Sequence, residues 1–221
     1  MPGRQSIPRP PGWSPVDGPA WRSDVDLHAL TSTPPVAPVG SYAEVLAPVG
    51  WPQPPRLSAV LVALSDGLPD RSGVHVLVTR RADHLRHHAG EVSFPGGRVE
   101  PDESPVVAAL REAAEEVALA PHAVDVRGEL PHLHTYVSGS YIVPIVGVVE
   151  RPPALVPNPE EVDAAYWVPV TELLAPGVHH RELWRRGEPD VSLEFFDLAD
   201  DIVWGATARV LVSLLADHAT S

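Results

Sequence analysis

Three glutamates crowd one face of a predicted helix. Glu112, Glu115 and Glu116 stand at positions i, i+3 and i+4, which places their carboxylates side by side. Like charges at these spacings cost roughly a few tenths of a kcal/mol each. A hard divalent cation would reverse that balance, because Mg²⁺ takes oxygen ligands and bridges to phosphate oxygens. Taken alone, such a pattern is more often a solvated acidic face, with Arg111 paired to Glu115.

The spacing of the residues around this helix favours the metal site. Seven positions follow a fixed order: Gly97, Glu103, Arg111, Glu112, Glu115, Glu116 and Leu119. This order resembles the signature of the Nudix hydrolase family. Two departures exist, because Ala118 stands where that signature has glycine and Ala113 is small for a bulky apolar position. Neither departure removes a candidate ligand.

The resemblance implies both a fold and a chemistry. The fold would be α/β, a Nudix α/β/α sandwich with a mixed β-sheet and a loop-helix-loop catalytic motif. The chemistry would be hydrolysis of a diphosphate bond, with Mg²⁺ or Mn²⁺ activating water and neutralising phosphate oxygens. By carry-over, the metal ligands are the Gly97 carbonyl and the side chains of Glu112, Glu115 and Glu116. Arg111, Glu115 and Glu116 would act in catalysis, and Glu103 would support the loop through Arg111.

A further acidic residue precedes a predicted strand. Nudix enzymes often carry an extra carboxylate on a loop that faces the signature helix. Glu161, in the segment Asn158-Pro159-Glu160-Glu161-Val162, is the candidate for an additional ligand or for the general base. The alternative is that these charges only mark the solvated start of the strand.

The segment before Gly97 resembles the coenzyme A pyrophosphatase branch of the family. The matching residues are Thr79, Arg80, Leu85, Arg86, His88, Gly90, Phe94, Pro95, Gly96 and Gly97. The resemblance implies coenzyme A or a derivative as substrate, with Arg80, Arg86 and His88 as binding residues. Coenzyme A carries a diphosphate and a separate phosphate, and arginine binds phosphate bidentately. Arg80, Arg81 and Arg86 form the densest basic cluster in the chain.

Several alternatives remain open at this point. Arg86 and His88 could instead brace the loop before Pro95, and His84, His87 and His88 could suggest zinc. The substrate could be another nucleoside diphosphate derivative, such as a nucleoside triphosphate, a nucleotide sugar or a dinucleotide. The domain could also be a catalytically inactive Nudix module that senses a ligand, although such modules usually lose the carboxylates that this chain keeps.

Hydrophobic patterning predicts the elements that position these residues. Apolar runs indicate strands at residues 59–64, 74–79, 124–130, 142–149 and 163–168. Ser104 and Pro105 favour a helix over 104–117, with an apolar stripe opposite the glutamates. A closing helix is expected at 206–215. Strands mixed with helices indicate an α/β fold.

Composition bounds the organisation and the partners. Thirteen of the 27 prolines precede Leu57, so residues 1–55 are expected to form a partly ordered extension whose tryptophans (Trp13, Trp21 and Trp51) dock on the domain. That extension could otherwise be a proline-rich ligand for another protein. Residues 56–217 would form the catalytic domain and 218–221 a tail.

The net charge of −13 argues against a nucleic-acid-binding protein, and zero cysteines exclude disulfides and thiolate chemistry. The sequence shows neither a signal peptide nor a membrane span, so a cytoplasmic protein with a small-molecule substrate is expected. Family analogy is consistent with a homodimer.

Overall fold

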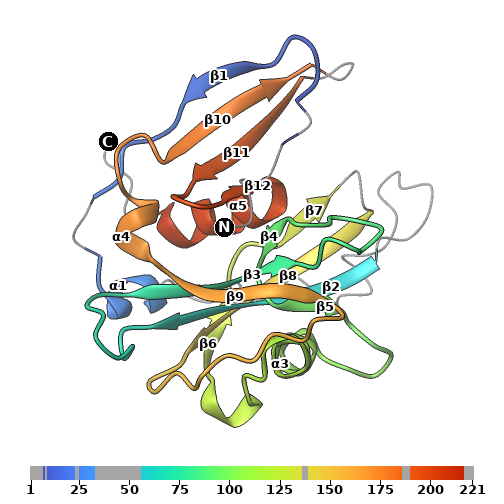
Figure 1. Ribbon diagram of the computed structural model, residues 1–221, viewed down its shortest axis with the longest axis vertical. Coiled ribbons are helices and arrows are strands. Elements are labelled where there is room, and N and C mark those ends of the chain that lie inside the picture. Colours follow the sequence, from blue (N-terminus) through green and yellow to red (C-terminus); the bar gives the residue numbers. More distant parts are fainter. Residues whose placement is uncertain are drawn as a thin grey trace.

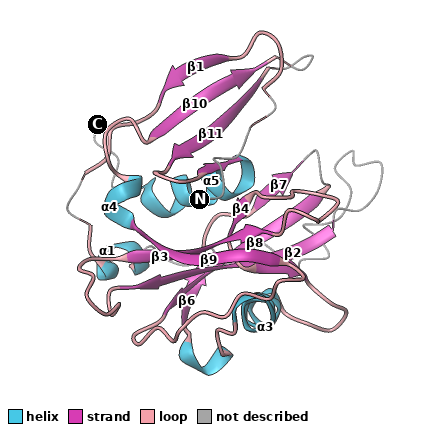
Figure 2. Cartoon of the chain, in the orientation of Figure 1, coloured by secondary structure: helices cyan, strands magenta, loops and turns pink. Residues whose placement is uncertain are grey.

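The computed structural model describes residues 7, 9–22, 25–32, 56–135, 139–185 and 190–216. Trp51, the tail at 218–221 and the segment 136–138 lie outside these residues. An eight-stranded mixed sheet forms the centre, and a four-stranded antiparallel sheet lies beyond one of its faces (Figures 1 and 2). The expected α/β architecture with a mixed sheet is confirmed. The second sheet was not predicted.

The central sheet is organised around strand β2 (Arg56–Ser65). It runs parallel to β8 (Ser140–Val148) and antiparallel to β3 (His75–Arg81). Because helices cover both faces, β2 is apolar along most of its length. The remaining strands are β4 (Val92–Ser93), β5 (Gly96–Arg98), β6 (Asp125–Glu129), β7 (Leu133–Thr135) and β9 (Val162–Pro169).

Helix α3 (Pro105–Val117) covers one face of this sheet (Figure 1). The Ser104 hydroxyl accepts a hydrogen bond from the amide of Val107, as expected of a capping residue. Ala113 is fully buried in the core between the helix and the sheet, so its small side chain lets the helix lie close to the strands. A short 3-10 helix (Pro121–Ala123) leads from α3 into β6.

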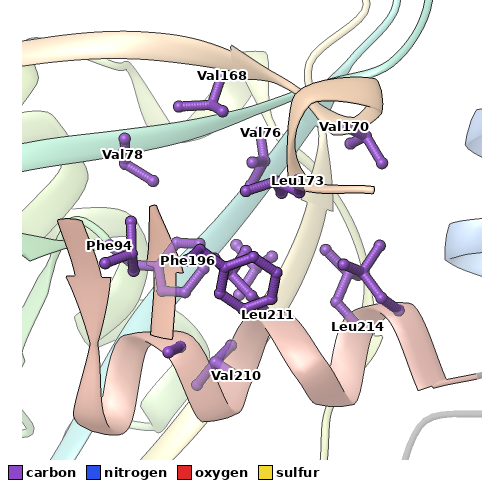
Figure 3. Packing of buried hydrophobic residues seen from close by; sticks show 14 of the residues in the cluster. Val76, Val78, Phe94, Val168, Val170, Leu173, Phe196, Val210, Leu211 and Leu214 are labelled. Atoms are coloured by element: carbon purple, nitrogen blue, oxygen red, sulfur yellow. The ribbon is translucent and has the colours of Figure 1, made fainter. Parts of the chain in front are cut away.

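Helix α5 (Gly205–Leu215) covers the opposite face. Its residues Leu211 and Leu214 pack with Val76 and Val168 of the sheet and with Phe196 (Figure 3). The short helix α4 (Val170–Leu173) adds to the same core. The closing helix predicted at 206–215 is therefore confirmed. Within the described residues, no helix is long and apolar enough to cross a bilayer.

The second sheet has the order β1-β10-β11-β12. Its strands are β1 (Ser14–Asp17), β10 (His179–Trp184), β11 (Val191–Asp197) and β12 (Ile202–Trp204). Two of the buried positions in β10 hold His179 and Glu182, so the strand lacks an apolar alternation. The buried Glu182 carboxylate accepts hydrogen bonds from Arg9 and from the Trp184 indole. These polar core residues explain why hydrophobic patterning missed β10.

Parts of the first 55 residues pack onto the rest of the chain. Strand β1 pairs with β10, and helix α1 (Leu27–Thr31) places Leu30 in the core on the α5 side, with 2% of its surface exposed. Trp21 packs partly buried against that core, whereas Trp13 stays 41% exposed and lies against the Arg9 guanidinium.

Candidate active site

Two glycines bring the loop before α3 into close contact with its surroundings. A Cβ atom at Gly96 would stand 2.4 Å from the Ala59 carbonyl oxygen, and one at Gly97 would stand 2.3 Å from Oε1 of Glu112. Both distances are shorter than atoms tolerate. The backbone of β5 can therefore approach β2 at Gly96 and the Glu112 carboxylate of α3 at Gly97 only because these positions carry no side chain.

Three carboxylates converge beside this backbone. The nearest oxygens of Glu112, Glu116 and Glu161 all lie within 4.8 Å of one another. Glu112 and Glu116 come from α3, while Glu161 directly precedes β9. Oxygen ligands gathered in this way suit Mg²⁺ or Mn²⁺. Among the described residues no other group of three potential ligands converges, so His84, His87 and His88 do not form a zinc site there.

Glu116 is the most deeply buried of the three, with 2% of its surface exposed. Burial raises its pKa to about 8, and the neighbouring Glu112 and Glu161 act in the same direction, while a hydrogen bond of 3.2 Å from the Gly96 amide to Oε2 opposes them. Burial also raises the pKa of Glu112. In the protein alone, too little positive charge lies near these two carboxylates to offset the cost of burying their ionised forms. A divalent cation would supply that charge.

Arg111 is held in place by the carboxylates around it. Its Nε and Nη2 donate to the two oxygens of Glu103 at 2.9 and 3.1 Å. Its Nη1 donates to Glu112 and to Glu115, each at 3.0 Å, and Nη2 also reaches the Arg98 carbonyl. The Arg111 hydrogen bond lowers the pKa of the Glu103 carboxyl. Arg111 therefore joins the loop before α3 to the helix and fixes the orientation of Glu112.

Glu115 takes a different place from its two neighbours. Its side chain is 53% exposed and pairs with Arg111, four residues earlier on the helix. It does not belong to the converging group of carboxylates. All three glutamates lie on one face of α3, as their spacing predicted. Glu112 and Glu116 converge beside the sheet, whereas Glu115 lies at the solvent-exposed edge of that face.

The loop that carries Glu161 is anchored to the end of α3. The amides of Val156 and Asn158 donate to the carbonyls of Val117 and Glu116, at 3.1 and 2.8 Å. On its other side, the Ala82 amide donates to the Glu161 carbonyl at 2.9 Å. These bonds bring together residues at least 39 positions apart in the sequence, and they place the Glu161 carboxylate next to those of α3.

The three residues expected to contact substrate lie in different surroundings. Arg80 donates through Nε and Nη2 to both oxygens of Asp201, which is 4% exposed and also accepts from the Tyr166 hydroxyl. Arg86 is exposed to solvent. His88 has a backbone φ of 58° and bonds through Nδ1 to Glu91 at 2.9 Å, which raises its pKa. The structure thus does not bring Arg80 together with the carboxylate cluster.

Sequence reasoning did not identify Asp201 as a partner of Arg80. Asp201 follows the second sheet's strand β11, more than 100 residues along the chain, and a single sequence offers no local signal for such a pairing.

The chain is similar to known proteins in sequence and in fold. Residues 55–186 match the NUDIX domain family. An uncharacterized Nudix hydrolase, NudL of Yersinia pestis (strain Pestoides F), is 42% identical over 142 residues, which cover 62% of this chain and 68% of that protein. A MutT/nudix family protein from Enterococcus faecalis is 18% identical with a TM-score of 0.49, covering 79% of this chain and 68% of that chain. The NUDIX domain of Shewanella oneidensis NrtR, complexed with ADP ribose, is 22% identical with a TM-score of 0.43. The match covers 61% of this chain and 87% of that chain.

Proposed function

Because this chain belongs to the NUDIX domain family and is a Nudix hydrolase, we propose that it cleaves the diphosphate bond of coenzyme A or of a coenzyme A derivative. A water oxygen would form a bond to one phosphorus while the bridging P–O bond breaks. The products would be 4′-phosphopantetheine and adenosine 3′,5′-bisphosphate. The observation that carries the hydrolytic part is the convergence of Glu112, Glu116 and Glu161 beside the Gly96-Gly97 backbone.

The carboxylate cluster fits a divalent cation. Glu116 is buried and its pKa is raised. The carboxylates of Glu112 and Glu161 lie beside it and add further negative charge. Glu112, Glu116 and the Gly97 carbonyl would hold Mg²⁺ or Mn²⁺. A bound cation would supply positive charge to the diphosphate oxygens and make a nearby water more acidic. Glu115 would join only by exchanging its bond with Arg111 for one to a metal.

Glu161 is our candidate for the general base. It lies in the same cluster as Glu112 and Glu116 but comes from the loop before β9 rather than from α3. In this role its carboxylate takes the proton of the attacking water. Arg111 and Glu103 act indirectly, because they hold Glu112 in a single orientation.

The coenzyme A part of the proposal depends on the segment before Gly97. Arg86 is an exposed cation in the segment between β3 and β4, and protonated His88 would add a second. These two residues are our candidates for binding the phosphate groups outside the cleaved bond. The guanidinium of Arg80, the third residue expected to contact substrate, is already bonded to Asp201.

A substrate panel tests this proposal. The purified protein is incubated with Mg²⁺ or Mn²⁺ and, in parallel, with coenzyme A, acyl-coenzyme A, coenzyme A disulfide, nucleotide sugars, dinucleoside polyphosphates and nucleoside triphosphates. Products are identified by mass, and ¹⁸O-labelled water shows which phosphorus is attacked. We expect the highest kcat/KM with a coenzyme A compound. Preferential cleavage of another diphosphate would refute the substrate assignment, and no cleavage of any would refute the hydrolytic one.

A further inference from the structure

Two adjacent arginines end strand β3, and they face opposite sides of the central sheet. Successive strand residues alternate between faces. Leu77 belongs to the core on the α3 side and Val78 to the core on the α5 side. In keeping with this alternation, Arg80 bonds to Asp201 on the α5 side. Arg81 therefore lies on the same face as Leu77, which is the face that α3 covers.

The backbone at this point is irregular in a way that suits a functional site. The pairing of β3 with β9 shifts its register between Arg80 and Arg81, and Arg81 then pairs with Val162, the residue after Glu161. Its amide and carbonyl are bonded to Glu91 and Gly90 of the loop that follows β3. Such bulges often redirect side chains next to active sites. Arg81 thus stands where β3, the Glu161 loop and the Gly90 loop meet.

The guanidinium of Arg81 differs from those of Arg80 and Arg111 in its hydrogen bonds. The guanidinium of Arg111 is bonded to three carboxylates, and that of Arg80 is bonded to Asp201. The Nε of Arg81 is buried and has no hydrogen-bond partner within the part of the chain that the structure describes. A buried donor without an acceptor is costly, and more so on a charged group. The described residues thus leave this donor open to an acceptor from a bound molecule.

The charge of Arg81 acts on the carboxylate cluster. Arg81 pairs across the sheet with Val162, the residue directly after Glu161 of the cluster. A guanidinium this near would repel a cation in the cluster unless an anion stood between the two. A diphosphate bound to metal ions is such an anion, and arginine offers it paired donors.

We propose that Arg81, rather than Arg80, binds the diphosphate oxygens of the substrate next to the Glu112–Glu116–Glu161 cluster. Arg80 is then a positioning residue, which ties β3 to the second sheet through Asp201. This inference rests on the proposed diphosphatase function but not on coenzyme A as the substrate, because every candidate substrate shares the diphosphate.

Calorimetric titrations with two probes test the proposal on the full chain. Mn²⁺ alone measures the carboxylate cluster, and inorganic pyrophosphate added to the Mn²⁺-saturated protein measures the diphosphate site. In Arg81→Ala we expect the Kd for pyrophosphate to rise about 10- to 100-fold, as for the loss of charged hydrogen bonds. The Kd for Mn²⁺ should stay the same or fall, because a repelling charge has been removed. Arg81→Lys should recover part of the pyrophosphate affinity.

Two control variants complete the test. Arg209→Ala removes an equal charge from an exposed position on α5 and should leave both affinities unchanged. Arg80→Ala should lower Tm, because it leaves the buried Asp201 carboxylate without its cationic partner, while the folded protein keeps its affinity for pyrophosphate. The inference is overturned if Arg81→Ala binds pyrophosphate as tightly as the wild type. It is also overturned if that variant loses affinity for Mn²⁺ and pyrophosphate together with a fall in Tm, which would make Arg81 structural.

The substrate panel separates this inference from the proposed function. Cleavage of a diphosphate other than coenzyme A would refute the proposed substrate, yet the pyrophosphate titration would still decide the role of Arg81. Wild-type protein that binds Mn²⁺ but not pyrophosphate would refute the role of Arg81, while cleavage of coenzyme A in the panel would still support the proposed function.

Discussion

The carboxylate of Glu112 lies directly against the backbone of Gly97, with room for hydrogen but not for a methyl group. A Cβ atom at position 97 would stand 2.3 Å from Oε1 and 2.4 Å from Cδ of that side chain. Glu112 also bonds to Arg111. The position of one proposed metal ligand is thus set from two directions, by the loop and by the helix.

Gly97→Ala should displace the Glu112 carboxylate and lower kcat/KM by at least about 100-fold, since active-site displacements near 1 Å have effects of that order. The added methyl group must either push Glu112 aside or shift β5. Activity and the Kd for Mn²⁺ are measured against Gly177→Ala as a control. Gly177 has φ +80° but nothing within 4 Å of where a Cβ would stand, so its variant should lose about 1 kcal/mol of stability and keep full activity. Equal activities in the two variants would contradict the role of this contact.

The stability of the metal-free protein should fall as pH rises from about 4.5 to about 8. Burial favours the protonated form of Glu116, raising its pKa from 4.5 to about 8, so the stabilising protonated state is complete below 4.5 and is lost toward 8. Melting temperatures in EDTA across this range measure the effect. Added Mg²⁺ should restore stability most strongly near pH 8. A Tm in EDTA that does not fall over this range would contradict the assigned burial cost.

Glu116→Gln should separate stability from activity. The amide is neutral at every pH, so in EDTA at pH 8 the variant should melt at a higher temperature than the wild type, while near pH 5 the two should differ little. Turnover with Mg²⁺ should fall by orders of magnitude, because a proposed ligand is neutralised. A variant that retains wild-type turnover would remove Glu116 from the site.

Glu161→Gln should reduce kcat by about 100-fold or more without unfolding the protein, in line with the loss of a general base. Its neighbour provides a matched control, because Glu160 is exposed and lies outside the carboxylate cluster. Glu160→Gln should therefore keep wild-type kcat. Steady-state kinetics and Tm of both variants are compared, and a similar kcat in the two would assign Glu161 only to the structure of the loop.

Ala118→Gly should stabilise the protein by about 1 kcal/mol. Ala118 ends α3 with φ 58°, a left-handed conformation that costs a residue with a Cβ roughly this much. The amides of Ala118 and Leu119 bond to the carbonyls of Ala114 and Ala113, so the helix end keeps its geometry in either variant. Urea unfolding at fixed pH provides the measurement. A loss of stability would mean that the methyl group makes contacts worth more than the strain.

Arg86→Ala should weaken the use of coenzyme A more than the use of a diphosphate that lacks the 3′-phosphate. Exposed Arg86 is proposed to bind a phosphate outside the cleaved bond, so kcat/KM for coenzyme A should fall about 10-fold and that for dephospho-coenzyme A much less. If both substrates lose equally, Arg86 braces the loop instead.

The sequence by itself determined the longer elements of the central domain, namely five of the eight strands of its sheet and the helices α3 and α5. Helical periodicity placed Glu112 and Glu116 on one face of α3, and the capping pair Ser104 and Pro105 marked where that helix begins, because such preferences depend on neighbouring residues alone. The continuous apolar run of β2 likewise identified a strand buried on both faces.

Only the tertiary structure decided which of these residues meet. Glu161 joins the cluster through hydrogen bonds between its loop and the end of α3, and Glu115 leaves it because Arg111 holds its carboxylate at the exposed edge. Arg80 and Arg81 are neighbours in the sequence, yet opposite faces of one strand give the first a partner in Asp201 and leave the Nε of the second without one among the described residues. Contacts across the sheet and across more than 100 residues depend on packing, which local patterns of side chains do not encode.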